Sequence, residues 1–125
     1  MVNTIVETVV DRNQFLNQLL PSNEGLILIK FGATWCKPCQ LIKPIVTKQV
    51  SMWPETVKCY SLDVDDNFDI YAYFKNKRMI NGIPVILAYK KGNNSFVPDL
   101  SVTGANSGDL QKFFFNCTTI LNSVS

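Results

Sequence analysis

Two cysteines separated by two residues are the side chains in this sequence best suited to chemistry. Cys36 and Cys39 lie in the segment 35–39, Trp-Cys-Lys-Pro-Cys, which follows an apolar run and opens a predicted helix. A helix N-terminus carries unsatisfied N–H groups and a partial positive charge, which stabilise a thiolate at Cys36 and lower its pKa below the usual value of about 8.5. Cys39 lies one turn further on, where it can attack a mixed disulfide formed at Cys36. This spacing therefore predicts a redox motif.

The other interpretation of the C-x-x-C pair is one half of a zinc site. Such a site needs two further ligands, usually a second C-x-x-C pair or two histidines. The chain has no histidine, and its remaining cysteines, Cys59 and Cys117, are isolated. We therefore expect no metal, and we expect Cys59 and Cys117 to be buried as small hydrophobic side chains. The lack of histidine also excludes Ser-His and Cys-His nucleophilic mechanisms.

The composition favours one globular domain, residues 1–125. The chain has 125 residues, of which 46% are hydrophobic, and a formal net charge of +2. This small charge gives no electrostatic footprint for nucleic acid or an anionic membrane, and the longest apolar runs, 25–29 and 82–89, are too short to span a bilayer. We expect a monomer that binds neither nucleic acid nor membrane.

The sequence also bears on the compartment and on cofactors. The first eleven residues lack the basic and apolar regions of a signal peptide and contain an early acid, Glu7. The hydrophobic core is large enough to fold without disulfide bonds, so we expect a reducing compartment and a cytoplasmic protein. No G-x-G-x-x-G motif is present, so no bound nucleotide or flavin cofactor is expected.

The elements expected to position the cysteine pair alternate between strands and helices. Apolar patterning predicts strands over residues 4–9, 26–31, 56–63, 84–89 and 95–103. Helices are predicted from residue 11, from the cysteine pair to about residue 52, over 67–77, and from residue 107. The order βαβαβαββα predicts an α/β fold with a mixed five-stranded sheet and helices on both faces.

Individual residues predict the caps of two of these helices and the apolar face of a third. Asp11, with Gln14 three residues later, is expected to cap the first helix as a capping box, and Ser107 is expected to cap the last. The apolar side of the third helix is expected to consist of Phe68, Ile70, Tyr71 and Phe74.

Further motifs accompany the cysteine pair along the whole chain. They are the segment 31–39 (Phe-Gly-Ala-Thr-Trp-Cys-Lys-Pro-Cys), the helix proline Pro44, Gly82-Ile83-Pro84 before the fourth strand, Lys91-Gly92 at a turn, and Thr103-Gly104-Ala105 after the fifth. Together they resemble the thioredoxin family, and the resemblance implies the thioredoxin fold. A lone C-x-x-C pair is a weak signal, whereas this combination is specific.

The resemblance implies a role for each matching residue. Cys36 would be the exposed attacking thiol and Cys39 the buried resolving one. The Ile83–Pro84 peptide bond would be cis and would face the cysteines, and the backbone before the proline would pair with an extended substrate strand. The substrate-binding residues would be Trp35, Lys37, Pro38, Gly82, Ile83, Pro84 and Gly104. The positive charge of Lys37 would favour the Cys36 thiolate slightly. An alternative of equal weight is that Lys37 is an ordinary solvated surface lysine.

One departure from the family concerns charge beneath the cysteine pair. Thioredoxins usually carry a buried aspartate six residues before the attacking cysteine, where this chain has Lys30. Lys30 either reaches solvent or lies beneath Cys39, where it would tune the pKa of that thiol or transfer its proton. Asp63 lies two residues after Ser61, points to the same face of the sheet, and is a possible partner for Lys30.

These observations support two hypotheses about function. The first is a protein-disulfide reductase, an electron-transport oxidoreductase whose oxidised pair would, by resemblance, be recycled by an NADPH-dependent thioredoxin reductase. The second is a thioredoxin-fold binding module with low redox turnover, motivated by the missing acid and by a longer segment between residues 65 and 84. Retention of both cysteines favours the first.

Overall fold

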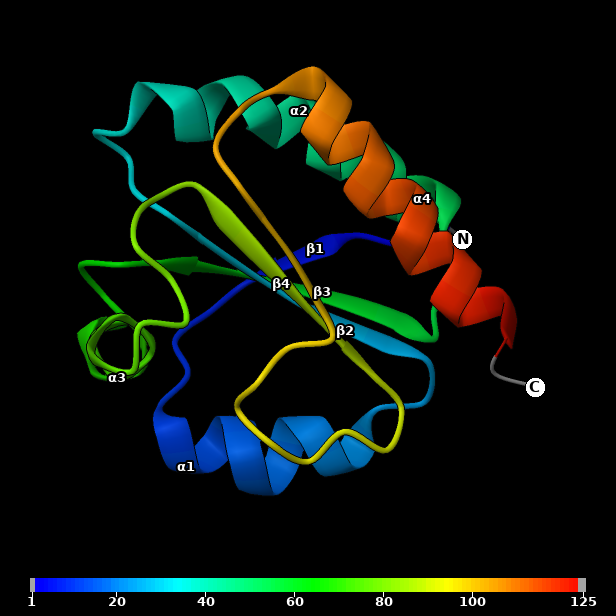
Figure 1. The fold of residues 1–125 in the computed structure, drawn as a ribbon, viewed down its shortest axis with the longest axis horizontal. Coiled ribbons are helices and arrows are strands. Elements are labelled where there is room, and N and C mark those ends of the chain that lie inside the picture. Colours follow the sequence, from blue (N-terminus) through cyan, green and yellow to red (C-terminus); the bar gives the residue numbers. More distant parts are fainter. Residues whose placement is uncertain (1, 124–125) are drawn as a thin grey trace.

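The computed structural model describes residues 2–123 and contains one mixed five-stranded sheet (Figure 1). The strands are β1 (Ile5–Glu7), β2 (Leu26–Gly32), β3 (Val57–Asp63), β4 (Val85–Lys90) and β5 (Leu100–Thr103), arranged in the order β1-β3-β2-β4-β5. β3 pairs parallel with both β1 and β2, whereas β4 pairs antiparallel with both β2 and β5. The expected order of elements and the expected mixed sheet are confirmed.

The helices cover both faces of this sheet, as expected. The long helices α2 (Lys37–Met52) and α4 (Ser107–Ser123) lie on one face, and α1 and α3 (Phe68–Asn76) lie on the other (Figure 1). The short helix α1 (Arg12–Gln14) continues as a π-helical segment (Phe15–Leu19) and a 3-10 turn (Leu20–Ser22).

The central strand β2 separates two hydrophobic cores. All seven of its residues are buried, because helices cover both sides of it. Side chains alternate along a strand, so Leu26 and Leu28 pack toward α2 and α4, whereas Ile27, Ile29 and Phe31 pack toward α1 and α3. Lys30 follows the first set by this alternation, and it therefore points toward α2 rather than out of the end of the sheet.

The last predicted strand is shorter than the sequence indicated. We expected it over residues 95–103, but β5 begins only at Leu100. The preceding residues form side-chain hydrogen bonds instead: Asn93 accepts from the Ser95 N–H at 3.0 Å and donates to the Val97 carbonyl at 2.9 Å. Such local bonds compete with pairing in a sheet, and Pro98 cannot donate to one.

Two local predictions at the helices are wrong, and one is confirmed in part. Asp11 caps α1 by accepting from the Gln14 N–H at 2.8 Å, as expected, but among residues 2–123 the Gln14 side chain makes no return bond, so the full capping box does not form. At α4 the capping side chain is Asn106, one residue before the expected Ser107, and it accepts from the Asp109 N–H at 2.9 Å. Phe68 is 71% exposed, because it lies two residues before the buried Ile70 and so falls on the opposite side of α3.

A buried asparagine that the sequence did not single out connects two segments. The Asn67 side chain accepts from the Val10 N–H at 2.7 Å and donates to the carbonyls of Asp63 at 3.0 Å and Thr8 at 3.3 Å. It therefore joins the chain after β1 to the turn between β3 and α3. The buried bond to Val10 is the costliest to lose, because the freed N–H would be left without a partner away from water.

Replacing Asn67 with Ala should therefore destabilise the fold. We expect the free energy of unfolding to fall by about 2–3 kcal/mol, because one buried and two partly buried hydrogen bonds are lost. Urea denaturation of the oxidised protein measures this change. Asn76→Ala, at the exposed end of the same helix, is the matched control and should change stability by less than about 0.5 kcal/mol. Equal effects of the two variants would contradict the role assigned to Asn67.

Candidate functional site

The cysteine pair lies at the N-terminus of α2, directly after the central strand. Cys36 is the N-cap residue of this helix and Cys39 lies in its first turn. The two form a disulfide bond, and their Cα atoms are 5.3 Å apart. The spacing of the motif and the start of the helix therefore combine as the sequence predicted.

A backbone N–H group is directed at the Cys36 sulfur. The Cys36 Sγ accepts from the Cys39 N–H at 3.2 Å, and the Cys36 N–H donates to the Ala33 carbonyl at 3.2 Å. The Gln40 side chain donates to the same Ala33 carbonyl at 3.1 Å, which holds the loop against the helix. Once the disulfide is reduced, an N–H donor at a helix N-terminus stabilises negative charge on Cys36.

The accessibility of the two sulfur-bearing residues differs less than we expected. Cys36 is 7% exposed and Cys39 is 2% exposed, so Cys36 is the more accessible of the two. The expectation that Cys36 is exposed is nevertheless wrong for the oxidised protein. The disulfide and the N–H of Cys39 hold its sulfur against the first turn of α2.

Trp35 is exposed and its ring is oriented by an acid that the sequence analysis missed. The indole Nε1–H donates to the Asp65 carboxylate at 2.9 Å. The backbone N–H of Asp65 in turn donates to the Asp63 side chain at 2.8 Å. Asp63 therefore shapes the turn that presents Asp65 to Trp35. No local pattern could have shown this contact, because Trp35 and Asp65 are thirty residues apart in the sequence.

The Ile83–Pro84 peptide bond is cis, as the resemblance implied. The Pro84 carbonyl accepts from the Gly104 N–H at 2.8 Å, so these two expected groove residues are neighbours. Gly104 has a φ of +93°, which favours glycine because a Cβ atom is strained in that region. Val85, which directly follows Pro84, pairs with Phe31 in the sheet. The loop before Pro84 therefore lies beside β2, the strand that leads to the cysteines.

Lys37 and Pro38 form the first turn of α2 and are exposed, and Gly82 lies in the loop before Pro84. A side chain at Gly82 would meet no other atom within 4 Å, so packing does not require glycine there.

Lys30 lies beneath Cys39 and does not extend freely into solvent. It is only 6% exposed. Its Nζ lies 3.8 Å, and the Cys39 Sγ lies 3.4 Å, from the position that a Cβ atom on Gly32 would occupy. Gly32 therefore provides a close approach between β2 and α2, and the Lys30 Nζ and the Cys39 Sγ both lie within 4 Å of its Cβ position.

Lys30 has no hydrogen-bond or ion-pair partner among residues 2–123. The two ion pairs in this part of the chain are Arg12–Asp69 and Lys43–Glu7, so the expected pairing of Lys30 with Asp63 is absent. Burial lowers the pKa of the Lys30 ammonium, and the positive charge of Lys43 lowers it further. Opposing effects of Cys59 and Glu7 do not reverse this direction.

The other two cysteines are buried and are not bonded to each other. Cys59 and Cys117 are free thiols in the core beneath α2 and α4, as expected. Burial raises the pKa of each to about 12, so both remain neutral and unreactive at neutral pH.

Two further properties follow from the described residues alone. Among residues 2–123, no group of three or more His, Cys, Asp or Glu side chains is placed to hold a metal ion. Within the same range, no helix is long and apolar enough to cross a membrane.

Comparisons with known proteins agree with this geometry. The thioredoxin family model matches residues 6–115. The chain is 36% identical over 100 residues to thioredoxin 3 of Plasmodium falciparum, covering 79% of this chain and 52% of that protein. It is 35% identical over 108 residues to a thioredoxin of Ophiophagus hannah, covering 86% of this chain and 94% of that protein. The chain thus spans about half the length of one relative and nearly all of the other.

Solved structures show the same fold. A crystal structure of Plasmodium falciparum thioredoxin is 32% identical, with a TM-score of 0.66 over 90% of this chain and 88% of that one. A thioredoxin of Trypanosoma brucei brucei is 25% identical, with a TM-score of 0.73 over 95% of both chains.

The buried lysine predicts an unusual dependence of stability on pH. The folded-state pKa of Lys30 lies below its unfolded value, so the cost of burying the ammonium is fully present below the folded pKa. That cost disappears as the pH rises from the folded pKa toward 10.5, because the unfolded state then binds more protons. Lys30→Met should therefore be more stable than the wild type at pH 7, by about 1.4 kcal/mol for each unit of pKa shift.

Denaturation of oxidised protein between pH 7 and 10.5 tests this expectation. The advantage of Lys30→Met should shrink across that range, whereas the exposed matched control Lys48→Met should differ from the wild type by a constant amount. A Lys30→Met protein that is less stable at pH 7 would show that the ammonium is well solvated.

Proposed function

The chain belongs to the thioredoxin family as a thiol–disulfide oxidoreductase of the thioredoxin type, and on that premise we propose that its Cys36–Cys39 pair reduces disulfide bonds in protein substrates. The observation that carries this proposal is the disulfide at the N-terminus of α2, with a backbone N–H directed at the Cys36 sulfur. Reduction, rather than oxidation, is the direction that we assign.

The proposed reaction has two exchanges. The Cys36 thiolate attacks one sulfur of the substrate disulfide, so a mixed disulfide forms and the other substrate sulfur leaves as a thiolate that takes up a proton. Cys39 then loses its proton and attacks the Cys36 sulfur. The substrate departs as a dithiol, and the protein, which has given up two electrons, holds the Cys36–Cys39 disulfide.

The substrate is proposed to lie in a groove beside the cysteine pair. Trp35, Gly82, Ile83, Pro84 and Gly104 would line it, and the backbone of Ile83 would pair with an extended substrate strand. Two hydrogen bonds support this arrangement. The Asp65 carboxylate accepts from the Trp35 ring, and the Pro84 carbonyl accepts from the Gly104 N–H. The exposed side chains of Lys37 and Pro38 would border the same groove beside Cys36.

By resemblance to the thioredoxin family, an NADPH-dependent thioredoxin reductase is the proposed source of electrons. The sequence itself contains no dinucleotide motif. We propose a reducing compartment, the cytoplasm, since Cys59 and Cys117 are both free thiols. Family membership does not fix this location, because a related thioredoxin of rice is named as chloroplastic.

Lys30 is proposed to tune the second exchange. It lies close to the Cys39 sulfur, as the distances to the Gly32 position show. A cation at this place favours the Cys39 thiolate and therefore the reduced form. Asp63 is proposed to act only through the turn at Asp65, since it does not pair with Lys30.

Substitution of each cysteine should separate the two exchanges. Cys36→Ser should abolish the acceleration of insulin reduction by dithiothreitol, because Cys39 is buried and because Cys59 and Cys117 are buried and neutral. Cys39→Ser should still attack and should accumulate mixed disulfides with substrate proteins. Mass spectrometry of complexes trapped by Cys39→Ser, with Cys36→Ser as the matched control, measures both steps. If Cys36→Ser forms the complexes and Cys39→Ser does not, the assigned order of attack is reversed.

The insulin assay also separates the reductase from a binding module. Wild-type protein that accelerates insulin reduction as a standard thioredoxin does would support the reductase. A rate no higher than that of Cys36→Ser would favour the binding module instead.

Replacing Lys30 should change the reduction potential of the pair. Lys30→Asp puts an anion near Cys39, which disfavours its thiolate and should make the potential more negative. Lys30→Met removes the charge only, so its shift should have the same sign and a smaller size. One pKa unit corresponds to about 30 mV for a two-electron couple. Redox titration against glutathione or dithiothreitol gives the three potentials, and three equal values would exclude an electrostatic role for Lys30.

A further inference from the structure

A cavity lies behind the cysteine pair, on the side of the sheet covered by α2. Its volume is about 980 Å³, and its walls come from α2, β3 and the segment around β1. Cys39 lines this cavity, but Cys36 and the proposed groove residues Trp35 and Pro84 do not. The cavity is therefore separate from the place where a substrate disulfide would be attacked, although it adjoins the resolving cysteine.

The floor of the cavity holds a buried cation without a partner. Lys30 lines the cavity, is 6% exposed, and makes no hydrogen bond or ion pair within residues 2–123. Every fully enclosed side-chain nitrogen or oxygen in this range has a hydrogen-bond partner. The unpartnered Lys30 Nζ is thus not fully enclosed, and the cavity is the space from which it is reached.

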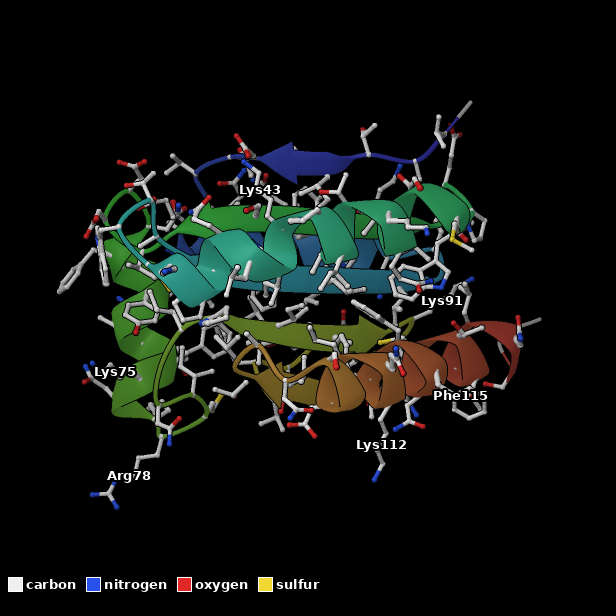
Figure 2. All side chains as sticks on the ribbon, turned by 90° about the horizontal axis from the view of Figure 1, so that it is seen from above. Lys43, Lys75, Arg78, Lys91, Lys112 and Phe115 are labelled. Atoms are coloured by element: carbon white, nitrogen blue, oxygen red, sulfur yellow. A yellow bond between two sulfur atoms is a disulfide. The ribbon has the colours of Figure 1, made fainter. Side chains whose placement is uncertain are left out.

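None of the three acids that line the cavity forms an ion pair with Lys30. Glu7 on β1 and Lys43 on α2 pair with each other at 3.7 Å, and Figure 2 shows Lys43 on the side of α2 that faces β1. Two further acids line the cavity, but the Asp63 carboxylate accepts from the Asp65 N–H and Asp66 is exposed. Lys30 is therefore the lining cation without an ion-pair partner among the described residues, and the carboxylate of a ligand that reaches its Nζ would supply one.

The remaining wall shows what kind of anion fits. Ser61 pairs with Lys30 in the β2–β3 register, so the two side chains lie next to each other on one face, and both line the cavity. Val2, Ile5 and Val9 supply apolar wall near β1. A cavity of about 980 Å³ is far larger than an inorganic ion and lies within the range of sites for small organic molecules.

We propose that this cavity binds a small organic carboxylate, with its carboxylate on Lys30 and Ser61 and its apolar part against the wall beside β1. Two charge-assisted hydrogen bonds, from the Lys30 Nζ and the Ser61 hydroxyl, would fix the carboxylate, and burial of the apolar part would add affinity. Binding does not rest on the proposed function, because no cysteine takes part in it.

Occupancy of this site would bias the redox state of the pair. Cys39 shares the cavity with Lys30, so a bound carboxylate opposes negative charge on the Cys39 sulfur. The oxidised protein, whose cysteines carry no charge, should therefore bind the carboxylate more tightly than the reduced protein. By thermodynamic linkage, tighter binding of the carboxylate to the oxidised than to the reduced protein makes the reduction potential of the Cys36–Cys39 pair more negative.

Titration with butyrate, followed by NMR of backbone amides in oxidised protein at pH 7, tests the site. Butyramide has the same shape without the charge and is the matched control ligand. We expect saturable shifts at Lys30, Cys39 and Ser61 with a dissociation constant of about 1–10 mM for butyrate, and at least tenfold weaker binding of butyramide. Lys30→Met should weaken butyrate binding at least tenfold, whereas the exposed control Lys48→Met should leave it unchanged.

Several results would overturn the proposal. Equal binding of butyrate and butyramide to the wild type would show an apolar pocket without a role for charge, and this comparison needs no variant. Butyrate binding that survives Lys30→Met, or the absence of saturable shifts up to 100 mM butyrate, would exclude Lys30 as an anion site. Equal affinities of oxidised and reduced protein would exclude the redox coupling, whatever the outcome of the insulin assay.

Discussion

The site depends on one junction, where the buried strand β2 ends and α2 begins. Helices on both faces hold β2 in place, so its last residues and the loop after it deliver Cys36 to the N-cap position of α2. There the Cys39 N–H reaches the Cys36 sulfur at 3.2 Å. A helix N-terminus offers unpaired donors wherever it occurs, but only a rigid strand fixes which atom they meet.

The same junction brings a lysine and a sulfur together. Gly32 lacks a side chain, so β2 and α2 approach closely, and Lys30 and Cys39 lie next to the space left open. Within residues 2–123, the buried side chains of Asn23 and Asn67 both donate and accept hydrogen bonds. Lys30 is the contrast, because it is buried and unpartnered and faces a cavity. Retaining an unpartnered cation in such a place costs stability, which points to a role in chemistry or binding.

Particular residues show how far the sequence could lead. The cysteine spacing, the apolar run of β2 and the alternation of elements predicted the fold and the redox pair, because these signals are local or periodic. The capping residue of α4 was predicted one position too late, and Phe68 was assigned to the wrong face of α3. Both errors arose because neighbouring residues near a helix end have similar sequence preferences. The contact of Asp65 with Trp35 was missed entirely, because it joins residues thirty positions apart.

The sequence by itself determined that two thiols stand one helical turn apart at the start of a helix, within an α/β chain. It determined this because residue spacing and helix geometry are properties of a short segment. Only the tertiary structure decided that the Lys30 side chain lies near Cys39 and opens to a cavity, and that Asp63 leaves it unpaired. Those outcomes depend on which faces of separate strands and helices meet, and packing settles that only when the whole chain has folded.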